Sequence, residues 1–365
     1  MSFSDRLGMT VWQAIIAWSL VLLIGGAAGV VSMLLCQYLL SFGGSDSANK
    51  HGISSVEASR VGGVAIVGYC LLLLAYQNTQ GRVDVGATEW GLLAPAMTFF
   101  VLGLWEDLLA TLSSSRRFLL MSLISLTALM IFPSLVLVDS GVLIVDWLVS
   151  TGFSAILFTS VCLAFIPNAF NTADGANGLI SGVAVIALWG ISTVMPEANA
   201  LLVRTVITGT LIFMVFNLVS GRFFLGDGGA YFLGAFCGAV LVVTANSADV
   251  STWWMLALIF YPVADLLWSM GRRIKAGASP LAPDNQHLHN LIFALLKQGA
   301  PGSQTANTMT GVGIACLFSG VPLLLQMGMQ VPVNASTWLG VVVVQWAVYI
   351  GAWFWLSQRV CSLSE

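Results

Sequence analysis

The stretch Asn168-Ala-Phe-Asn-Thr-Ala-Asp-Gly-Ala-Asn-Gly-Leu179 lies between two long apolar runs and carries a polar side chain at every third position. These side chains belong to Asn168, Asn171, Asp174 and Asn177. Neighbours at this spacing share one side of an α- or 3₁₀-like turn, and Gly175 and Gly178 allow a backbone or a ligand to approach closely. A capped loop between two membrane helices would also explain the stretch, so its meaning depends on the rest of the chain.

The composition places the chain among polytopic membrane proteins. Of its 365 residues, 58% are hydrophobic and 8% are charged, and the mean hydropathy is +0.92. A soluble globular domain carries roughly 25% charged residues, so that class is excluded. The net charge of −3 is too small to indicate a nucleic-acid partner. The six cysteines lack CxxC spacing and indicate small hydrophobic residues rather than disulfides or metal ligands.

Apolar runs long enough to cross roughly 30 Å of hydrocarbon predict an all-α integral membrane protein with about 10 to 11 transmembrane helices. The runs are 11–41, 61–77, 90–106, 118–138, 141–166, 178–195, 199–219, 229–246, 252–270, 308–328 and 334–357. The first run is too long for a signal-peptide core and has no small-residue cleavage site, so we expect a retained span. Asp146 and Gly152 make 141–166 the weakest span. No internal repeat divides the chain, which predicts a single domain over 1–365.

Basic residues orient these spans. If the spans alternate, most of the 13 lysines and arginines fall on one side, and only Arg6, Arg82 and Arg204 fall on the other. The positive-inside rule therefore predicts an outside N-terminus and an inside C-terminus. The loops assigned to the cytoplasm are 42–60, 107–117, 167–177, 220–228 and 271–307.

Two motifs on the cytoplasmic side occur at span ends. Arg60-Val-Gly-Gly63 places a base before a glycine pair, although such pairs also serve helix packing. Gly103-Leu-Trp-Glu-Asp-Leu108 puts Glu106 and Asp107 side by side where the chain leaves the lipid. Adjacent carboxylates repel each other unless a cation or a proton relieves them. An ordinary solvated helix end is the alternative interpretation.

A third motif, Phe223-Phe-Leu-Gly-Asp-Gly-Gly-Ala230, holds Asp227 between glycines just before an apolar run. This setting suits a ligand for a hard cation or a carboxylate near phosphate. Gly-Asp also occurs in intramembrane aspartyl proteases. Their Gly-x-Gly-Asp motif is absent because Phe224 occupies its first glycine position, and no Tyr-Asp pair occurs on another span. The protease interpretation is therefore disfavoured.

The last cytoplasmic loop combines bases with two histidines. Asp265 and Arg272 are seven residues apart, which places them on one helix face. Arg272 and Arg273 lie where anionic phosphates would dock, although a basic loop is also a plain positive-inside signal. His287 and His289 would take opposite faces of a helix, which excludes a zinc helix of the His-x-x-x-His kind. In an extended segment both could face one site.

The order of these motifs, from about 60 to 290, resembles the polyprenyl-phosphate N-acetylhexosamine-1-phosphate transferase family, glycosyltransferase family 4. The resemblance rests on Arg-Val-Gly-Gly, Gly-Leu-Trp-Glu-Asp-Leu, Asn-Ala-Phe-Asn-x-x-Asp-Gly-x-x-Gly-Leu, Phe-x-Gly-Asp-x-Gly and Ser-Pro-x-x-Pro-Asp-x-x-His-Leu-His. It implies a bacterial inner-membrane enzyme with a cytoplasmic active site. The implied reaction is Mg²⁺-dependent, with Mn²⁺ as an alternative, and transfers a sugar 1-phosphate from a UDP-sugar such as UDP-GlcNAc to undecaprenyl phosphate, releasing UMP.

The resemblance also implies roles for individual positions. Asp227 stands at the metal-binding aspartate, and Asp107 at the second residue of an Asp-Asp pair proposed to activate the lipid phosphate. Phe224 is a candidate ring for stacking on uracil. The residues expected to be catalytic are Glu106, Asp107, Asp174 and His287. The residues expected to bind substrate are Asn171, Asn177, Asn217, Phe224, Arg272, Arg273 and His289.

Three departures from the family pattern leave individual roles open. Glu106 replaces an aspartate, Asn177 replaces the second acid of Asp-Gly-x-x-Asp, and Asn290 stands where the family has a further histidine. The peptidoglycan branch has three consecutive histidines, so the chain resembles the surface-polysaccharide branch, which includes O-antigen and lipopolysaccharide synthesis. Direct attack by the lipid phosphate, with Asp107 steering or deprotonating it, is the favoured mechanism. A covalent phospho-aspartate intermediate stays open.

A transporter of an anionic metabolite is the alternative class, because many spans and buried acids suit it equally well. It predicts polar groups near the bilayer midplane and a two-fold hydropathy repeat. Here the polar groups cluster at span ends on one side, and the chain shows no such repeat. The sequence therefore favours a transferase whose partners are a UDP-sugar, undecaprenyl phosphate and the lipid bilayer. No nucleic-acid partner is expected, and a homodimer is compatible with this hypothesis.

Overall fold

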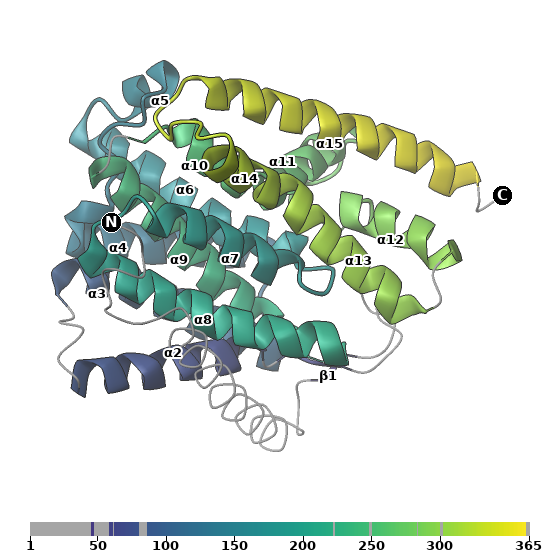
Figure 1. The fold of residues 1–365 in the computed structure, drawn as a ribbon, viewed down its shortest axis with the longest axis horizontal. Coiled ribbons are helices and arrows are strands. Elements are labelled where there is room, and N and C mark those ends of the chain that lie inside the picture. Colours follow the sequence, from purple (N-terminus) through teal and green to yellow (C-terminus); the bar gives the residue numbers. More distant parts are fainter. Residues whose placement is uncertain are drawn as a thin grey trace.

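The computed structural model is a bundle of α-helices, with α15 along one edge and α2 along the other (Figure 1). It describes residues 45–46, 58–60, 62–79, 86–221, 223–247, 250–282, 284–299 and 302–362. The long elements are α2 (Gly62–Thr79), α3 (Ala87–Leu109), α4 (Ser114–Ile131), α6 (Gly152–Ala173), α7 (Leu179–Ser192), α8 (Glu197–Ser220), α9 (Gly226–Ser247), α11 (Phe260–Lys275), α12 (Leu288–Gly299), α13 (Ser303–Ala315) and α15 (Thr337–Ser362). The short ones are β1 (Ser45–Asp46), β2 (Ala58–Ser59), η1 (Pro133–Leu135), α5 (Leu143–Leu148), α10 (Thr252–Leu258), η2 (Cys316–Gly320) and α14 (Val321–Gly328).

The all-α polytopic prediction is confirmed. Within the described ranges, eight helices are long and apolar enough to cross a membrane, or up to nine if the bent pair α10 and α11 is one span. Most predicted spans coincide with one of these helices, and 308–328 corresponds to the continuous helical stretch from α13 through α14. The predicted span 11–41 lies outside the described residues.

The predicted span 141–166 is wrong in its boundaries. The chain forms the short helix α5 and then starts α6 at Gly152. Thr151 explains this start, because its Oγ1 accepts a hydrogen bond from Ser154 N at 3.1 Å and caps the new helix. Since α6 then continues to Ala173, Asn168 and Asn171 belong to its last turns, and the predicted loop 167–177 is largely helical.

Two further spans differ from expectation. In place of 178–195 the chain forms α7, an apolar helix shorter than the membrane-crossing ones. The predicted span 252–270 is broken into α10 and α11, whose axes differ by 82°. The break at Ile259 has a local cause: Pro262 has no N–H to donate to the carbonyl of Leu258, so the helical ladder cannot continue.

Helix α9 forms the centre of the bundle, packed by α2, α3, α6 and α7. Of its most apolar window, 89% is buried. A Cβ added at Gly234 would lie 2.6 Å from Pro167 Cα, so only glycine permits the contact with α6. Asp227, in the first turn of α9, therefore lies at the end of the most enclosed helix.

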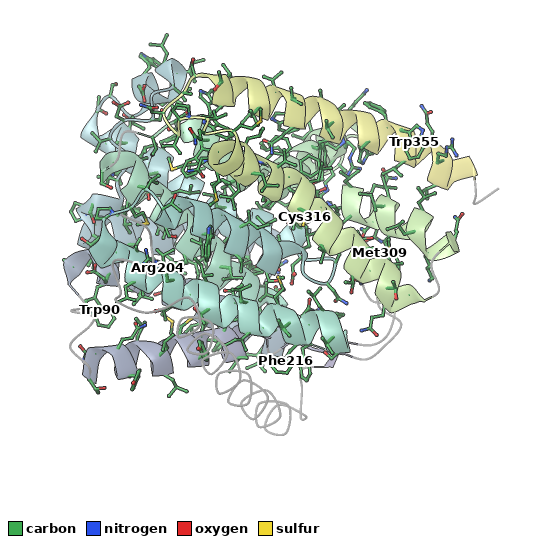
Figure 2. All side chains as sticks on the ribbon, viewed as in Figure 1. Trp90, Arg204, Phe216, Met309, Cys316 and Trp355 are labelled. Carbon is green, nitrogen blue, oxygen red and sulfur yellow. The ribbon has the colours of Figure 1, made fainter. Side chains whose placement is uncertain are left out.

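Large apolar side chains cover the outer surface. Leu72, Met130 and Val344 are 66%, 68% and 61% exposed, respectively. Trp90, Met309 and Trp355 also project from the periphery of the bundle (Figure 2). Such a surface suits lipid, whereas Asp107, Asp174 and Asp227 lie where α3 and α6 end and α9 begins.

Candidate functional site

Asp107 joins the C-terminal end of α3 to the N-terminal end of α9. Its Oδ1 accepts a hydrogen bond from the backbone N–H of Asp227 at 3.0 Å, and its Oδ2 accepts one from Gly228 N at 2.9 Å. The first N–H groups of a helix have no partner within the helix, and the positive end of the helix dipole stabilises a carboxylate there. Asp107 therefore caps α9 and lies beside Asp227, which belongs to the same helix start.

Glycines allow these helix ends to come so close. A Cβ added at Gly103, one turn before Asp107, would lie 2.6 Å from the carbonyl carbon of Asp227. A Cβ added at Gly63 would lie 2.4 Å from Gly229 N. Gly62 N also donates to Phe224 O at 3.0 Å. The glycine pair of Arg-Val-Gly-Gly thus docks the start of α2 against the backbone that positions Asp227.

Two arginines accompany the acids. Arg60 Nη1 lies 3.7 Å from Asp107 Oδ1, and Arg117 Nη1 lies 3.1 Å from Asp227 Oδ2. Sequence reasoning missed both as site residues and assigned the phosphate-binding role to Arg272 and Arg273. The sequence did offer a signal for both. Arg60 begins the Arg-Val-Gly-Gly motif, and Arg117 lies in the short predicted loop after the Glu106-Asp107 pair.

Tyr231 is a second omission. It follows Asp227 by one helical turn on α9, is buried, and accepts a hydrogen bond on its hydroxyl from Asn171 Nδ2 at 3.3 Å. It also interacts with the Arg117 guanidinium. The spacing of four residues from Asp227 places both side chains on one helix face and could have identified it.

Asp174 completes the group of acids. It follows the last residue of α6, and its carboxylate interacts electrostatically with those of Asp227 and Asp107. Burial, and then these two charges, raise the pKa of Asp174 to about 7, while Arg60 opposes the shift. Among the described residues, none donates a hydrogen bond to this carboxylate. We call Asp107, Asp174 and Asp227, with their two arginines, the acid cluster.

Glu106 has a different environment from its neighbour. It is 9% exposed, and its Oε2 accepts a hydrogen bond from Leu112 N at 3.2 Å. The predicted acidic pair is therefore divided: Glu106 holds the connection between α3 and α4, and Asp107 holds the start of α9.

Asn177 and Asn217 bind each other and nearby backbone. Asn217 Nδ2 donates to Asn177 Oδ1 at 3.3 Å and to Phe223 O at 2.7 Å, and its Oδ1 accepts from Gly178 N at 2.8 Å. Asn177 N donates to Oδ1 of Asn307 at 2.6 Å. Both predicted substrate-binding asparagines are 4% exposed. The arrangement holds the turn after Asp174 against α8 and α13, and Asn307 was not anticipated.

The four polar residues of the opening stretch do not form one face. Asn168 Nδ2 donates to Ala164 O at 2.9 Å on its own helix, whereas Asn171 reaches Tyr231 of α9. Because α6 ends at Ala173, the chain then turns. Asp174 and Asn177 consequently meet different neighbours, and the shared polar side expected from the spacing is not continuous.

The two histidines are brought together instead of being separated. Helix α12 begins at Leu288, between them, so the two are not on one helix, and the alternative in which both face one site applies. Their rings stack, with centroids 5.4 Å apart and planes at 5°. A Cβ added at Gly175 would lie 2.2 Å from His289 Nε2, so this histidine lies against the turn that carries Asp174. Burial lowers the pKa of His289 to about 4, although Asp265 opposes the shift.

Arg272 and Arg273 brace the loop that precedes the histidines. Arg272 Nη2 lies 2.7 Å from Asp284 Oδ2, and its guanidinium lies 4.9 Å from the ring centroid of Trp353. Arg273 Nη1 donates to Pro280 O at 2.6 Å. Arg272 and Asp265 also confirm the predicted shared helix face, because both contact the segment 284–288.

Phe224 and Phe223 differ in their surroundings. Phe223 packs against the hydrophobic core, whereas Phe224 is half-buried outside that core. The ring of Phe224 therefore retains an accessible surface, as a stacking residue requires.

The donor set is compatible with a hard cation. Within the described ranges, no three His, Cys, Asp or Glu side chains surround a common metal position. Magnesium, however, is usually held by one or two carboxylates together with water and substrate phosphates. Asp227 and Asp174 provide carboxylate oxygens where negative charges already crowd together, so these residues fit Mg²⁺.

The fold and the site define an all-helical, multi-pass membrane protein with a charged site at the ends of its helices. A family model described as glycosyl transferase family 4 matches residues 89–245, a region that contains Asp107, Asp174 and Asp227. Relatives named as polyprenyl-phosphate N-acetylglucosamine-1-phosphate transferases accompany this match. Over this region the chain is similar to glycosyl transferase family 4, and the relatives it matches are of the polyprenyl-phosphate N-acetylglucosamine-1-phosphate transferase type.

Three relatives illustrate the similarity. An undecaprenyl-phosphate α-N-acetylglucosaminyl 1-phosphate transferase of Escherichia coli O157:H7 is 28% identical over 178 residues, 45% of this chain and 48% of that protein. A probable undecaprenyl-phosphate N-acetylglucosaminyl 1-phosphate transferase of Bacillus subtilis is 25% identical over 280 residues, 73% of this chain and 74% of that protein. A decaprenyl-phosphate N-acetylglucosaminephosphotransferase of Mycolicibacterium smegmatis is 26% identical over 167 residues, 39% of this chain and 41% of that protein. The match to the first of these spans about half of its length.

Proposed function

We propose that this protein transfers an N-acetylhexosamine 1-phosphate from a UDP-sugar to undecaprenyl phosphate, releasing UMP. The observation that carries this proposal is the acid cluster: three carboxylates and two arginines meet at the N-terminus of α9, within or beside the region that the family model matches. The names of the relatives support a polyprenyl-phosphate acceptor and N-acetylglucosamine as the sugar.

Charge neutralisation is the main requirement of this reaction. The acceptor phosphate and the donor diphosphate are both anions, and they must approach each other against Coulomb repulsion. Arg60 and Arg117 would face these phosphates, and Asp227 with Asp174 would hold Mg²⁺. The bound metal would neutralise charge on the diphosphate oxygens.

The geometry of Asp107 favours positioning over proton abstraction. Both of its oxygens accept backbone N–H groups at the start of α9. A phosphate monoester has a second pKa of about 6, so the acceptor is already largely dianionic at neutral pH. A general base would therefore contribute less than correct placement. We favour direct attack by the lipid phosphate, with Asp107 holding the helix start and Arg60.

We also propose UDP-GlcNAc as the donor and synthesis of O-antigen or another surface polysaccharide as the pathway. The site would lie on the cytoplasmic face of a bacterial inner membrane. A reporter fused after Gln286 should then behave as cytoplasmic, and one fused near Asp84 as periplasmic. The reverse pattern would place the acid cluster on the wrong side for a nucleotide-sugar donor.

An isotope-exchange assay tests the reaction. One phosphoanhydride is broken and another is formed, so the free-energy change is small and the reverse reaction should be measurable. Purified protein with labelled UMP, unlabelled UDP-GlcNAc, undecaprenyl phosphate and Mg²⁺ should yield labelled UDP-GlcNAc. Replacing UDP-GlcNAc with other UDP-sugars identifies the donor.

The controls distinguish the mechanisms. Exchange should stop in EDTA and in Asp227→Ala, because loss of a transition-state charge partner typically costs about 10²-fold or more in rate. Exchange that persists in both conditions would contradict metal assistance. Exchange without any lipid acceptor would instead favour a covalent enzyme intermediate, and no exchange with any UDP-sugar would refute the transferase proposal.

A further inference from the structure

A buried polar network surrounds the two histidines and joins α11, α12 and α15. We call it the histidine cluster, and its members are Tyr261, Asp265, His287, His289 and Tyr349. Asp265 and Tyr261 are 0% exposed, and Tyr349 is 1% exposed. In such surroundings each polar hydrogen needs an acceptor, because an unsatisfied buried group costs about 1–3 kcal/mol. The hydrogen bonds therefore determine which nitrogen of each ring carries the proton.

Asp265 determines the protonation of His287. Its Oδ1 accepts hydrogen bonds from Tyr349 OH at 2.7 Å and from Leu288 N at 3.2 Å. Its Oδ2 lies 2.6 Å from His287 Nδ1. A carboxyl group is ordinarily a much stronger acid than an imidazolium, with a pKa of about 3.9 against about 6.5, so the hydrogen between Oδ2 and Nδ1 belongs to the imidazole. Nε2 is then the only position on this ring where a proton can be gained or lost.

Tyr261 determines the opposite arrangement in His289. The Tyr261 hydroxyl accepts a hydrogen bond from the His289 backbone N–H at 3.2 Å and lies 3.0 Å from His289 Nδ1. If Nδ1 carried a hydrogen, the hydroxyl would accept twice, and its own hydrogen would lack an acceptor among the residues that the structure describes. If the hydroxyl donates to Nδ1, the buried hydroxyl hydrogen is satisfied, and the ring hydrogen on Nε2, which no described residue accepts, is left for a ligand. The proton of His289 then resides on Nε2.

We propose that Asp265, Tyr349 and Tyr261 are positioning residues that hold His287 and His289 in opposite tautomers, so that the pair offers one acceptor and one donor nitrogen. His289 presents Nε2–H toward the turn at Gly175, next to Asp174. His287 presents Nε2 with a lone pair when its ring is neutral. The role in catalysis rests on the proposed function. A diphosphate oxygen of the substrate would accept a hydrogen bond from His289 Nε2–H. His287 Nε2 would accept a hydrogen bond from the substrate or exchange a proton with it.

The close approach at Gly175 supports this direction for His289. Nε2 is the ring atom that a Cβ at Gly175 would meet first, before the neighbouring carbons. An N–H aimed at a turn beside three carboxylates can donate to an anionic oxygen, whereas a lone pair there would repel it. The tautomer imposed by Tyr261 is therefore the one that suits an anionic ligand.

Nitrogen-15 NMR of the protein in nanodiscs tests the assignment directly. The chain contains only three histidines, so selective labelling gives few signals, and His51→Gln leaves the two of interest. Protonated and unprotonated ring nitrogens have well separated shifts. At neutral pH we expect one Nδ1–H ring and one Nε2–H ring, assigned by His287→Gln and His289→Gln. Two rings with the same tautomer would overturn the proposal.

Conservative variants separate positioning from folding. Tyr261→Phe removes only the hydroxyl, so the His289 signal should shift toward a mixture of tautomers. The KM for the donor should rise roughly fivefold with a smaller change in kcat, as loss of one hydrogen bond predicts. Tyr76→Phe, on the exposed part of α2, is the matched control and should change neither quantity. An unchanged His289 signal in Tyr261→Phe would refute the role of the hydroxyl.

The NMR result does not depend on activity. Opposite tautomers in a protein that exchanges no UDP-sugar would refute the proposed function and leave the hydrogen-bond assignment standing. Identical tautomers in a protein with full exchange activity would refute the assignment alone.

Discussion

Asp265 of the histidine cluster and Asp174 of the acid cluster have opposite surroundings. In the histidine cluster, Asp265 accepts one hydrogen bond from a tyrosine hydroxyl, one from a backbone N–H and one from an imidazole. In the acid cluster, Asp174 interacts with two other carboxylates. The first arrangement is internally satisfied and therefore rigid. The second is relieved by added positive charge, from a proton, a metal ion or the arginines.

This difference assigns different tasks to the two regions. A site that accumulates negative charge without an added cation is suited to bind one, and the phosphates that accompany it. A network with satisfied donors and acceptors is suited to hold side chains in one geometry. The following variants would break or sharpen the distinction.

The largest effect is expected at Asp107. An asparagine there has one oxygen and one NH₂ group, so it cannot accept both backbone N–H groups of Asp227 and Gly228. Asp107→Asn should reduce UMP exchange by about 10²-fold or more. Glu106→Gln is the matched control and should lose less, because its Oε1 can still accept from Leu112 N. A dead Glu106→Gln beside a fully active Asp107→Asn would reverse this assignment.

The next effect tests the contact between the two clusters. Gly175→Ala would place a Cβ 2.2 Å from His289 Nε2 and displace that ring. Overpacking of this kind costs about 1–3 kcal/mol of folding stability, and moving His289 away from Asp174 should separately reduce the exchange rate by roughly tenfold or more. Gly152→Ala, at the start of α6, meets nothing within 4 Å and is the control. Equal activity of the two variants would show that His289 does not need its position beside Asp174.

Arg117 provides a smaller effect within the acid cluster. Arg117→Gln removes the cation that lies 3.1 Å from Asp227 Oδ2. Loss of a cation that would face the substrate phosphates should lower the exchange rate roughly tenfold, which corresponds to about 1.4 kcal/mol of activation free energy. The neighbouring Arg116 is exposed, and Arg116→Gln should retain activity. Equal losses in both variants, measured at the same ionic strength, would indicate a general charge effect.

The smallest effects concern stability and pH, and they have opposite signs in the two clusters. The pKa of Asp174 is raised to about 7, so its contribution to stability is present at low pH and is lost as the pH rises through 7. Asp174→Asn should therefore raise the Tm more at pH 8 than at pH 5. This is measured by thermal unfolding in detergent, without Mg²⁺.

The pKa of His289 is lowered to about 4, so its contribution is present above the ordinary value of about 6.5 and is lost as the pH falls toward 4. His289→Gln should remove part of the acid-induced loss of Tm. If both variants changed the pH dependence in the same direction, the contrast between the clusters would be wrong.

Much of the architecture could be predicted from the sequence because membrane insertion depends on local properties. The length of an apolar run and the exclusion of charge from lipid can be read along the chain. These properties predicted the all-α class and most of the spans. They also predicted that Asp107, Asp174 and Asp227 occur at span ends on a common side, which matches their convergence in the structure. The span boundaries near Thr151 and Pro262 depended on capping and on a missing N–H, and were predicted less well.

Only the tertiary structure decided which side chains meet. Arg117 and Asp227 are 110 positions apart, and Tyr349 and Asp265 are 84 apart, so no local spacing records their contacts. The same limitation hid the mutual bonding of Asn177 and Asn217, and the stacking of the two histidines across the start of α12. Periodicity specifies the face of one helix, but partners on other helices depend on how glycines, prolines and helix ends allow the bundle to pack.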